Sequence, residues 1–201
     1  MKKMVIGITG AMGTGKSTVA GMMKSLAKNS IVLDADKIAE RFLKRGSSSF
    51  VLVCELFPEA VDHKGDINRK KLADAVFSDD SRLKSLNRLI HPLVVRAVKK
   101  KLEGINRNVI VLDVPLLIEA DMLGVVDKLV VVDADKKAIA KRSRFPKKEI
   151  ERRTKKQMTF RKKLSVARKV LGKNNVFIID NSLDTRNTKR QVSEIWLKMR
   201  R

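Results

Sequence analysis

Short apolar runs rich in β-branched residues alternate along this chain with segments of helical periodicity. We predict buried strands at five such runs, each followed by polar or glycine-rich sequence: Met4–Thr9, Ser30–Leu33, Val109–Leu112, Lys128–Val132 and Val176–Ile179. Between them apolar residues recur at helical spacing, as in Lys16–Lys28 and in the closing helix Asp184–Met199. This alternation predicts an α/β fold in three layers, with a five-stranded parallel sheet and helices on both faces.

The segment between the second and third predicted strands carries no strand pattern. Its apolar spacing predicts four helices, the last with a kink at Pro92: Lys37–Arg45, Ser48–Leu56, Asn68–Phe77 and Asp80–Glu103. We therefore expect a helical insertion over residues 37–105 at one edge of the sheet. The length of 201 residues fits a single domain, whose core would comprise 1–36, 106–135 and 174–201.

The net charge of +23 is unusual, and most of it comes from one segment. Residues 136–173 contain 17 Lys or Arg against 2 Asp or Glu. A charge run is usually a solvated helix face, but so strong a bias of one sign repels itself and favours polyanionic neighbours. Both nucleic acid and clustered phosphates fit this charge. The low aromatic content of 4%, with no tyrosine, argues against a platform that stacks single-stranded bases.

Composition and the N-terminal sequence exclude several other classes of protein. The apolar content of 43% is too high for a disordered chain, and no run reaches the ~18–20 apolar residues of a membrane span. The N-terminal apolar run is too short for a signal peptide. Cys54 is the only cysteine, so an intrachain disulfide is impossible and we expect a small buried side chain there. These features predict a cytoplasmic protein with no membrane partner.

Residues 10–17 match the phosphate-binding loop pattern G-x-x-x-x-G-K-[ST]. Glycines let the backbone N–H groups of such a loop converge on phosphate oxygens, and the following helix N-terminus adds positive potential. Lys16 can reach the β- and γ-phosphates of a nucleotide, and the Ser17 hydroxyl can ligate Mg²⁺. The expected ATP-binding residues of this loop are Ala11, Met12, Gly13, Thr14, Gly15, Lys16, Ser17 and Thr18.

The sequence beyond the loop distinguishes between classes of P-loop protein. A switch GTPase needs an N-K-x-D motif after a later strand, where this chain has Val132–Asp135. A motor or helicase ATPase usually has an acidic pair after its third strand, where this chain has Asp113-Val-Pro115. A small P-loop fold with a helical insertion and a basic lid over 136–173 is the plan of a metabolite kinase. The insertion would hold the acceptor, and the lid would bring arginines onto the phosphates and exclude water.

Seven motifs in chain order resemble those of the dephospho-coenzyme A kinase family, and the resemblance covers nearly the whole chain. They are Ile8–Ser17, Asp34–Asp36, Ile67–Arg69, His91–Pro92, Val114–Glu119, Lys141–Arg142 with Gln157, and Ile179–Asn181. The resemblance implies that ATP and Mg²⁺ serve to phosphorylate the ribose 3′-hydroxyl of dephospho-coenzyme A by direct in-line transfer. This reaction is the last step of coenzyme A biosynthesis.

The same resemblance implies roles for particular residues. Asp36 would orient or deprotonate the acceptor hydroxyl, with helix capping as its alternative role, and Lys16 and Arg142 would complete the catalytic set. Asp34 is the second candidate for the role of Asp36, again with helix capping as its alternative. Asp34 or Asp113 would assist Ser17 at Mg²⁺ through water. Arg142 and Arg144 would contact the ATP phosphates, and Asn181 with the turn after it would flank the adenine of ATP. The expected dephospho-coenzyme A residues are Thr9, Asp36, Arg69, His91, Pro92, Leu116 and Glu119, of which His91 could instead be a core or helix-start residue and Glu119 a helix cap.

Some positions depart from the family pattern, and other functions remain open from the residues alone. Ala11 and Met12 replace a glycine and an isoleucine, Leu183 replaces a glycine, and the stretch between Arg142 and Gln157 is shorter. The shorter stretch leaves four candidates for the phosphate contact: Arg142, Arg144, Arg152 and Arg153. The competing hypotheses are another small P-loop nucleoside or nucleotide kinase, a basic nucleic-acid-binding ATPase, and a non-catalytic member of the family. We expect a monomer that binds ATP and dephospho-coenzyme A, with no specific nucleic-acid partner and at most weak non-specific binding.

Overall fold

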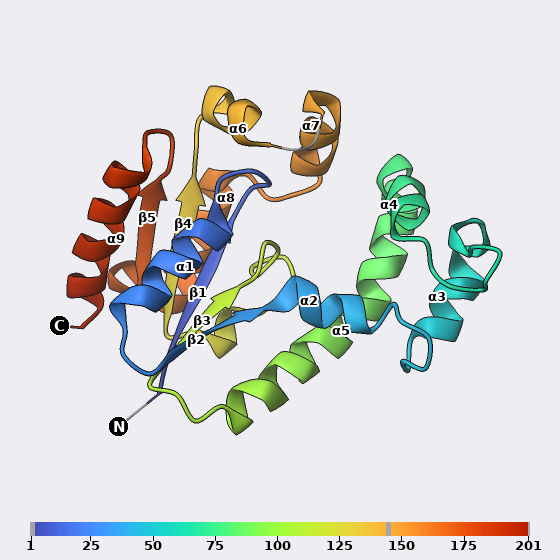
Figure 1. The fold of residues 1–201 in the computed structure, drawn as a ribbon, viewed down its shortest axis with the longest axis horizontal. Helices are drawn as coiled ribbons and strands as arrows, with labels where there is room; N and C mark the ends of the chain where they lie inside the picture. The colour runs from blue at the N-terminus through green and yellow to red at the C-terminus, as the bar shows by residue number, and fades with distance from the viewer. Residues whose placement is uncertain (1–2, 144–145, 201) are drawn as a thin grey trace. The chain divides into compact units, whose positions relative to one another are not determined.

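The computed structural model describes residues 3–143 and 146–200. Within them, a five-stranded sheet has the order β2-β3-β1-β4-β5, and every pairing is parallel (Figure 1). The strands are β1 (Met4–Gly10), β2 (Ser30–Asp34), β3 (Val109–Asp113), β4 (Lys128–Asp133) and β5 (Val176–Asp180). The five predicted strands are confirmed. Each extends one residue further at its carboxyl end, so that an aspartate or glycine stands at the same edge of the sheet.

Helices cover both faces of this sheet, as predicted. On one face α1 (Lys16–Leu26) and α9 (Thr185–Met199) contact each other and the strands, and on the other α8 (Phe160–Leu171) contacts β4 and β5 (Figure 1). Two shorter helices, α6 (Lys136–Arg142) and α7 (Lys147–Lys155), precede α8. The described residues also form three 3₁₀ turns: η1 (Pro58–Ala60), η2 (Leu123–Val125) and η3 (Lys173–Asn175).

The central strand β1 shows why the two faces pack differently. Ile6 and Ile8 are fully buried in the apolar cluster that includes residues of α1 and α9. Gly7 points to the opposite face because side chains alternate along a strand. A Cβ atom at Gly7 would lie 2.7 Å from Cδ1 of Leu117. The missing side chain therefore lets Leu117, and with it the segment that follows β3, pack directly on β1.

Residues Ala35–Glu103 form a second compact unit, distinct from the unit made by 1–34 and 104–201. Its helices are α2 (Ala35–Arg41), α3 (Phe50–Leu56), α4 (Arg69–Ser78) and α5 (Asp80–Gly104), whose last residue belongs to the first unit. Phe57 is 1% exposed, and the Arg82 guanidinium lies over its ring at 5.0 Å from the centroid. Asn68 begins α4 by accepting hydrogen bonds from the Lys70 and Lys71 N–H groups, a typical N-cap.

The prediction for the first helix of this unit was wrong at its carboxyl end. The sequence predicts a helix to Arg45, whereas α2 ends at Arg41. The hydroxyls of Ser47 and Ser49 donate to the Phe42 carbonyl oxygen at 2.7 and 2.6 Å, which competes with continuation of the helix. Gly46 then turns the chain in the left-handed region, at φ +83°. The helix α5 runs through Pro92 without interruption, to Gly104.

Candidate active site

The phosphate-binding loop joins β1 to α1 at the carboxyl edge of the sheet. Gly13 and Gly15 lie in the left-handed region with φ of +81° and +89°, and Gly15 is the residue that precedes α1. Side-chain-bearing residues rarely adopt this conformation, so both glycines are required by the turn. The loop therefore ends on the N-terminus of an 11-residue helix, where unpaired backbone N–H groups attract anions.

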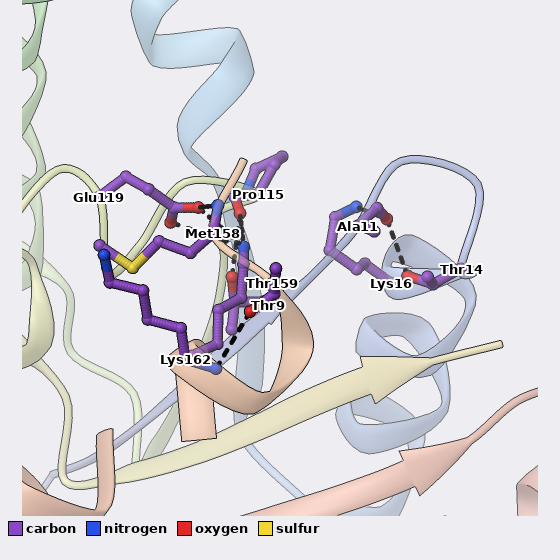
Figure 2. A network of polar contacts seen from close by, with 10 residues as sticks. Thr9, Ala11, Thr14, Lys16, Pro115, Glu119, Met158, Thr159 and Lys162 are labelled. Carbon is purple, nitrogen blue, oxygen red and sulfur yellow. Dashed lines mark hydrogen bonds and ion pairs between the residues drawn. The ribbon is translucent and has the colours of Figure 1, made fainter. Parts of the chain in front are cut away.

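Two side chains of the loop donate hydrogen bonds to the Ala11 carbonyl group. The Lys16 ammonium donates to the Ala11 carbonyl oxygen at 3.0 Å, and the Thr14 hydroxyl donates to the same oxygen at 2.9 Å (Figure 2). Thr14 is fully buried, whereas Lys16 is half-buried. The lysine thus carries its positive charge within the loop, where a β- or γ-phosphate oxygen can replace or join the carbonyl as its acceptor.

Two carboxylates stand side by side at the strand ends next to the loop. Asp34 ends β2 and Asp113 ends β3, and the two are paired in the register of the sheet. The Ser17 hydroxyl donates to Oδ2 of Asp113 at 2.8 Å. The other oxygen of Asp113, Oδ1, is buried and has no hydrogen-bond partner within the part of the chain that the structure describes.

The pKa of Asp113 reflects its burial and its incomplete hydrogen bonding. Burial raises its pKa above the ordinary value, the hydrogen bond from Ser17 and the charge of Lys16 oppose this rise, and the charge of Asp34 adds to it. An oxygen-rich group with an orphaned carboxylate oxygen fits a hard cation such as Mg²⁺. Among the described residues there is no group of three or more His, Cys, Asp or Glu side chains that could hold a metal alone. These residues therefore fit a Mg²⁺ that keeps waters and phosphate oxygens as its remaining ligands.

Asn181, directly after β5, holds the phosphate-binding loop by a hydrogen bond. Its amide nitrogen donates to the Thr14 carbonyl oxygen at 2.8 Å, and its amide oxygen accepts from the Thr188 hydroxyl of α9 at 2.6 Å. A Cβ atom at Gly15 would lie 2.2 Å from this amide nitrogen. Position 15 must therefore be glycine for its close approach to Asn181 as well as for its backbone conformation.

Arg142, the last residue of α6, also contacts Asn181 at the carboxyl end of β5. Its Nη2 donates to the backbone carbonyl of Asn181, and its Nε donates to the Ala138 carbonyl oxygen at 3.1 Å. The side chain is otherwise exposed. Arg142 is thereby fixed beside the loop, as a phosphate-binding residue needs to be. Arg144, the other predicted lid arginine, lies outside the described residues.

The predicted acceptor residues of the first unit lie in and around the segment that follows β3. The buried Thr9 hydroxyl donates to the Pro115 carbonyl oxygen at 2.9 Å, and Leu116 is half-buried. Glu119 accepts from the Met158 N–H at 3.0 Å and pairs with the Lys163 ammonium at 3.1 Å. Glu119 is therefore tied to the start of α8 and does not cap a helix.

The other predicted acceptor residues belong to the second unit, and their roles toward substrate stay predictions. Asp36 is exposed in the first turn of α2. Arg69, at the start of α4, pairs with Glu40 at 2.9 Å between Nη2 and Oε1. His91 is half-buried in α5 and Pro92 is exposed.

Sequence reasoning missed Lys163 and Thr188, the two residues that hold Glu119 and Asn181. Lys163 precedes the buried Ala167 by one helical turn, so it occupies an apolar position of the α8 pattern. A lysine at a position where the helical pattern expects an apolar residue is the sequence feature that could have identified Lys163. Thr188 is only 1% exposed and lies on the buried stripe of α9. No feature of the sequence distinguishes its hydroxyl from those of other threonines.

The sheet order, the phosphate-binding loop and the paired strand-end aspartates define a P-loop kinase fold. A gluconokinase of Sinorhizobium meliloti shares this fold, with a TM-score of 0.52 at 11% identity over 98% of this chain and 95% of the other. The chain belongs to the dephospho-CoA kinase family, whose model matches residues 4–179. The resemblance expected from the sequence motifs is thereby confirmed.

Individual relatives agree with this assignment over almost the whole chain. It is similar to the dephospho-CoA kinase of Aquifex aeolicus, with 35% identity over 98% of this chain and 97% of the relative. A crystal structure from Thermus thermophilus matches with a TM-score of 0.78 at 30% identity, covering 99% of this chain and 98% of the other. The dephospho-CoA kinase of Campylobacter jejuni shares the fold, with a TM-score of 0.65 at 23% identity over 98% of each chain.

None of the helices in the described residues is both long and apolar enough to cross a membrane.

Proposed function

We propose that this chain transfers the γ-phosphoryl group of ATP to the ribose 3′-hydroxyl of dephospho-coenzyme A. The observation that carries the proposal is the Ser17–Asp113 hydrogen bond beside an intact phosphate-binding loop, in a chain of the dephospho-CoA kinase family. Phosphoryl transfer needs positioning and charge neutralisation more than covalent help from the protein. The described residues supply both, from loop, strand ends and α6.

The nucleotide phosphates would bind across the loop. The backbone N–H groups at the start of α1 face the β-phosphate, and Lys16 exchanges the Ala11 carbonyl for a β- or γ-phosphate oxygen. Arg142 keeps its Nη2 on Asn181 and offers its other guanidinium hydrogens to the γ-phosphate, whose charge spreads during transfer. Asn181 acts on the loop through the Thr14 carbonyl, so its predicted place beside the adenine would fall to its backbone and to the following turn.

The residues that would hold Mg²⁺ are Ser17 by its hydroxyl and Asp113 by its orphaned Oδ1, with Asp34 beside them. When bound, this ion neutralises charge on the β- and γ-phosphate oxygens. The hydrogen bond from Ser17 to Oδ2 fixes the orientation of Asp113 and leaves Oδ1 without a hydrogen-bond partner among the described residues. Asp113 and Asp34 together give this edge a local negative charge, which Lys16 partly offsets.

Asp36 would orient the acceptor hydroxyl and take its proton. It follows the strand-end Asp34 by two residues and is exposed in the first turn of α2. The roles of Thr9, Leu116 and Glu119, and those of Arg69, His91 and Pro92, toward the acceptor remain predictions from the sequence. A cytoplasmic location and a monomeric state remain predictions from the sequence.

The test measures coenzyme A formed from dephospho-coenzyme A with ATP and Mg²⁺, with plain nucleosides as competing acceptors. Folded protein that forms no coenzyme A, or that phosphorylates nucleosides equally well, would contradict the proposal. Asp36→Asn should lower kcat with little change in the KM for ATP, because the carboxylate acts on the acceptor alone. Glu194→Gln, which neutralises an exposed carboxylate of α9, is the matched control and should retain full activity.

A further inference from the structure

Lys163 stands out among the cations of this chain. Of the Lys and Arg side chains that the structure describes, it alone is buried, with 2% of its residue surface exposed. It lies in α8, where neighbouring residues Arg161 and Lys162 are exposed. Burying an ammonium group costs several kcal/mol unless partners compensate for lost water, so this position calls for an explanation beyond packing.

The partners of Lys163 belong to the segment that follows β3. Its ammonium pairs with Oε1 of Glu119 at 3.1 Å and donates to the Pro115 carbonyl oxygen at 3.2 Å. The same carbonyl accepts from the Thr9 hydroxyl at 2.9 Å, at the end of β1 (Figure 2). The same carboxylate accepts from the Met158 N–H at 3.0 Å (Figure 2). Lys163 thus fastens a segment beside the phosphate-binding loop to the helix at the base of the lid.

The two oxygens of Glu119 are used unequally. Oε1 accepts from both Met158 and Lys163, whereas among the described residues Oε2 has only a contact of 3.5 Å with the ammonium. The Glu119 side chain remains 15% exposed. A carboxylate oxygen can accept more than one hydrogen bond. Oε2 therefore has the capacity to accept a hydroxyl from a ligand, in an orientation that Lys163 and Met158 impose.

Stability alone does not account for a lysine at this place. A buried ion pair is often no more stable than apolar side chains of similar volume, and the position one turn before Ala167 would accept an apolar residue. The charge has a separate consequence for ligand binding. A bare carboxylate would repel an acceptor that carries phosphates, whereas the ion pair presents the same oxygen without net charge.

We propose that Lys163 is a positioning residue for the acceptor, which holds Glu119 and the Pro115 carbonyl group so that Oε2 of Glu119 receives a hydroxyl of a phosphate-bearing ribose. The inference rests on the proposed function, because the acceptor is the substrate of that reaction. It adds a residue to the acceptor side that contacts neither substrate directly.

The experiment compares Lys163→Met with Lys169→Met, which removes an exposed charge from the same helix. We expect Lys163→Met to lower kcat/KM for dephospho-coenzyme A by about 10²-fold, the cost of a small misplacement in an active site. The KM for ATP should stay within about twofold of the wild type, since the nucleotide contacts are untouched. Lys169→Met should match the wild type in both constants, and Lys163→Arg should recover part of the loss because it keeps the charge.

A purely structural role predicts a different pattern. Unfolding of a fraction of the enzyme lowers kcat, and with it kcat/KM for both substrates in equal proportion, and leaves both KM values unchanged; that pattern overturns the inference. An unchanged KM and kcat/KM for dephospho-coenzyme A in folded Lys163→Met overturns the inference, while an inactive wild type overturns the proposed function instead.

A second comparison serves if Lys163→Met does not fold. The single variant Glu119→Gln is then compared with the double variant Glu119→Gln/Lys163→Met. In the double variant neither position 119 nor position 163 carries a charge, so no unpaired charge is buried there. The double variant should lose further kcat/KM for dephospho-coenzyme A, because Lys163 also holds the Pro115 carbonyl group. Equal values in the two variants overturn the inference.

Discussion

The close approach of Gly15 to Asn181 leads to a quantitative prediction for Gly15→Ala. The new Cβ atom would lie 2.2 Å from the Asn181 amide nitrogen, so the amide must move. Moving it breaks the 2.8 Å hydrogen bond to the Thr14 carbonyl, which is buried. Alanine must also adopt the left-handed conformation, at φ +89°. Both effects weaken the folded state and displace the loop that is to bind ATP.

The size of the effect follows from these two contributions. The left-handed conformation costs a non-glycine residue about 1–2 kcal/mol, and a buried carbonyl without its partner costs about 1–3 kcal/mol. The free energy of unfolding should therefore fall by about 2–5 kcal/mol. Each kcal/mol corresponds to roughly 2–4 °C in Tm for a chain of this size.

Asn181→Ala provides the second corner of a double-mutant cycle. It removes the same hydrogen bond to Thr14, for about 1–3 kcal/mol. In Gly15→Ala/Asn181→Ala that bond is lost only once and the clash is absent, so the double variant should lose about 2–5 kcal/mol, well below the summed losses. The expected coupling is about 1–3 kcal/mol.

Urea unfolding followed by circular dichroism, and ATP binding by calorimetry, measure these quantities. Gly21→Ala is the control, because Gly21 lies in α1, the helix that follows Gly15, and a Cβ there meets nothing within 4 Å. It should stabilise the protein by about 0.5–1 kcal/mol. Additivity of the two single losses within about 0.5 kcal/mol would refute the steric link between Gly15 and Asn181.

Three further predictions concern other parts of the molecule. Burial raises the pKa of Asp113, so its ionised form destabilises the folded protein. Asp113→Asn should therefore raise the Tm of metal-free protein at pH 7. This gain in Tm should vanish as the pH falls below the ordinary pKa of 3.8, where the aspartic acid and the asparagine side chains are both neutral. Thermal unfolding across this pH range checks the sign, and a gain that persists at low pH refutes it. Ser17→Ala should raise the Mg²⁺ concentration needed for half-maximal turnover, since it would remove a proposed ligand and the hydrogen bond that orients Asp113; an unchanged Mg²⁺ titration would count against the proposed site. Asn68→Ala should cost about 1 kcal/mol in urea unfolding, because two N–H groups of α4 lose their cap, and a loss near zero would show that this cap is dispensable.

Local patterns of the sequence were enough to predict the strands and the loop. Each strand is a short apolar run, and the loop spacing from Gly10 to Ser17 is a contiguous signal. The end of α2 could not be predicted in this way. It depends on two serine hydroxyls that reach back to Phe42, and the helical pattern alone does not show which carbonyl they choose.

Contacts between distant residues account for what the sequence did not reveal about the site. Asn181 and Thr14 are 167 positions apart, and Lys163 and Glu119 are 44 apart. A single sequence carries no record of such pairings, so neither the bond from Asn181 to Thr14 nor the pairing of Lys163 with Glu119 was predicted. In both cases the structure gives a buried polar group a specific partner, which is the condition under which such groups are tolerated.

The pairing pattern of the sheet also determines when the protein can fold during its synthesis. Every pairing within the described sheet involves β3 or β4, so β1 and β2 have no partner until Val109 emerges. At a synthesis rate of about 5–20 residues per second, the apolar β1 waits roughly 5–20 s after it is made. The strand β1, which leads into the phosphate-binding loop, is thus the first strand to be made and stays without a strand partner until β3 has been made. Nascent chains halted before β3 should be captured by chaperones, whereas chains that include β4 should resist proteolysis at β1.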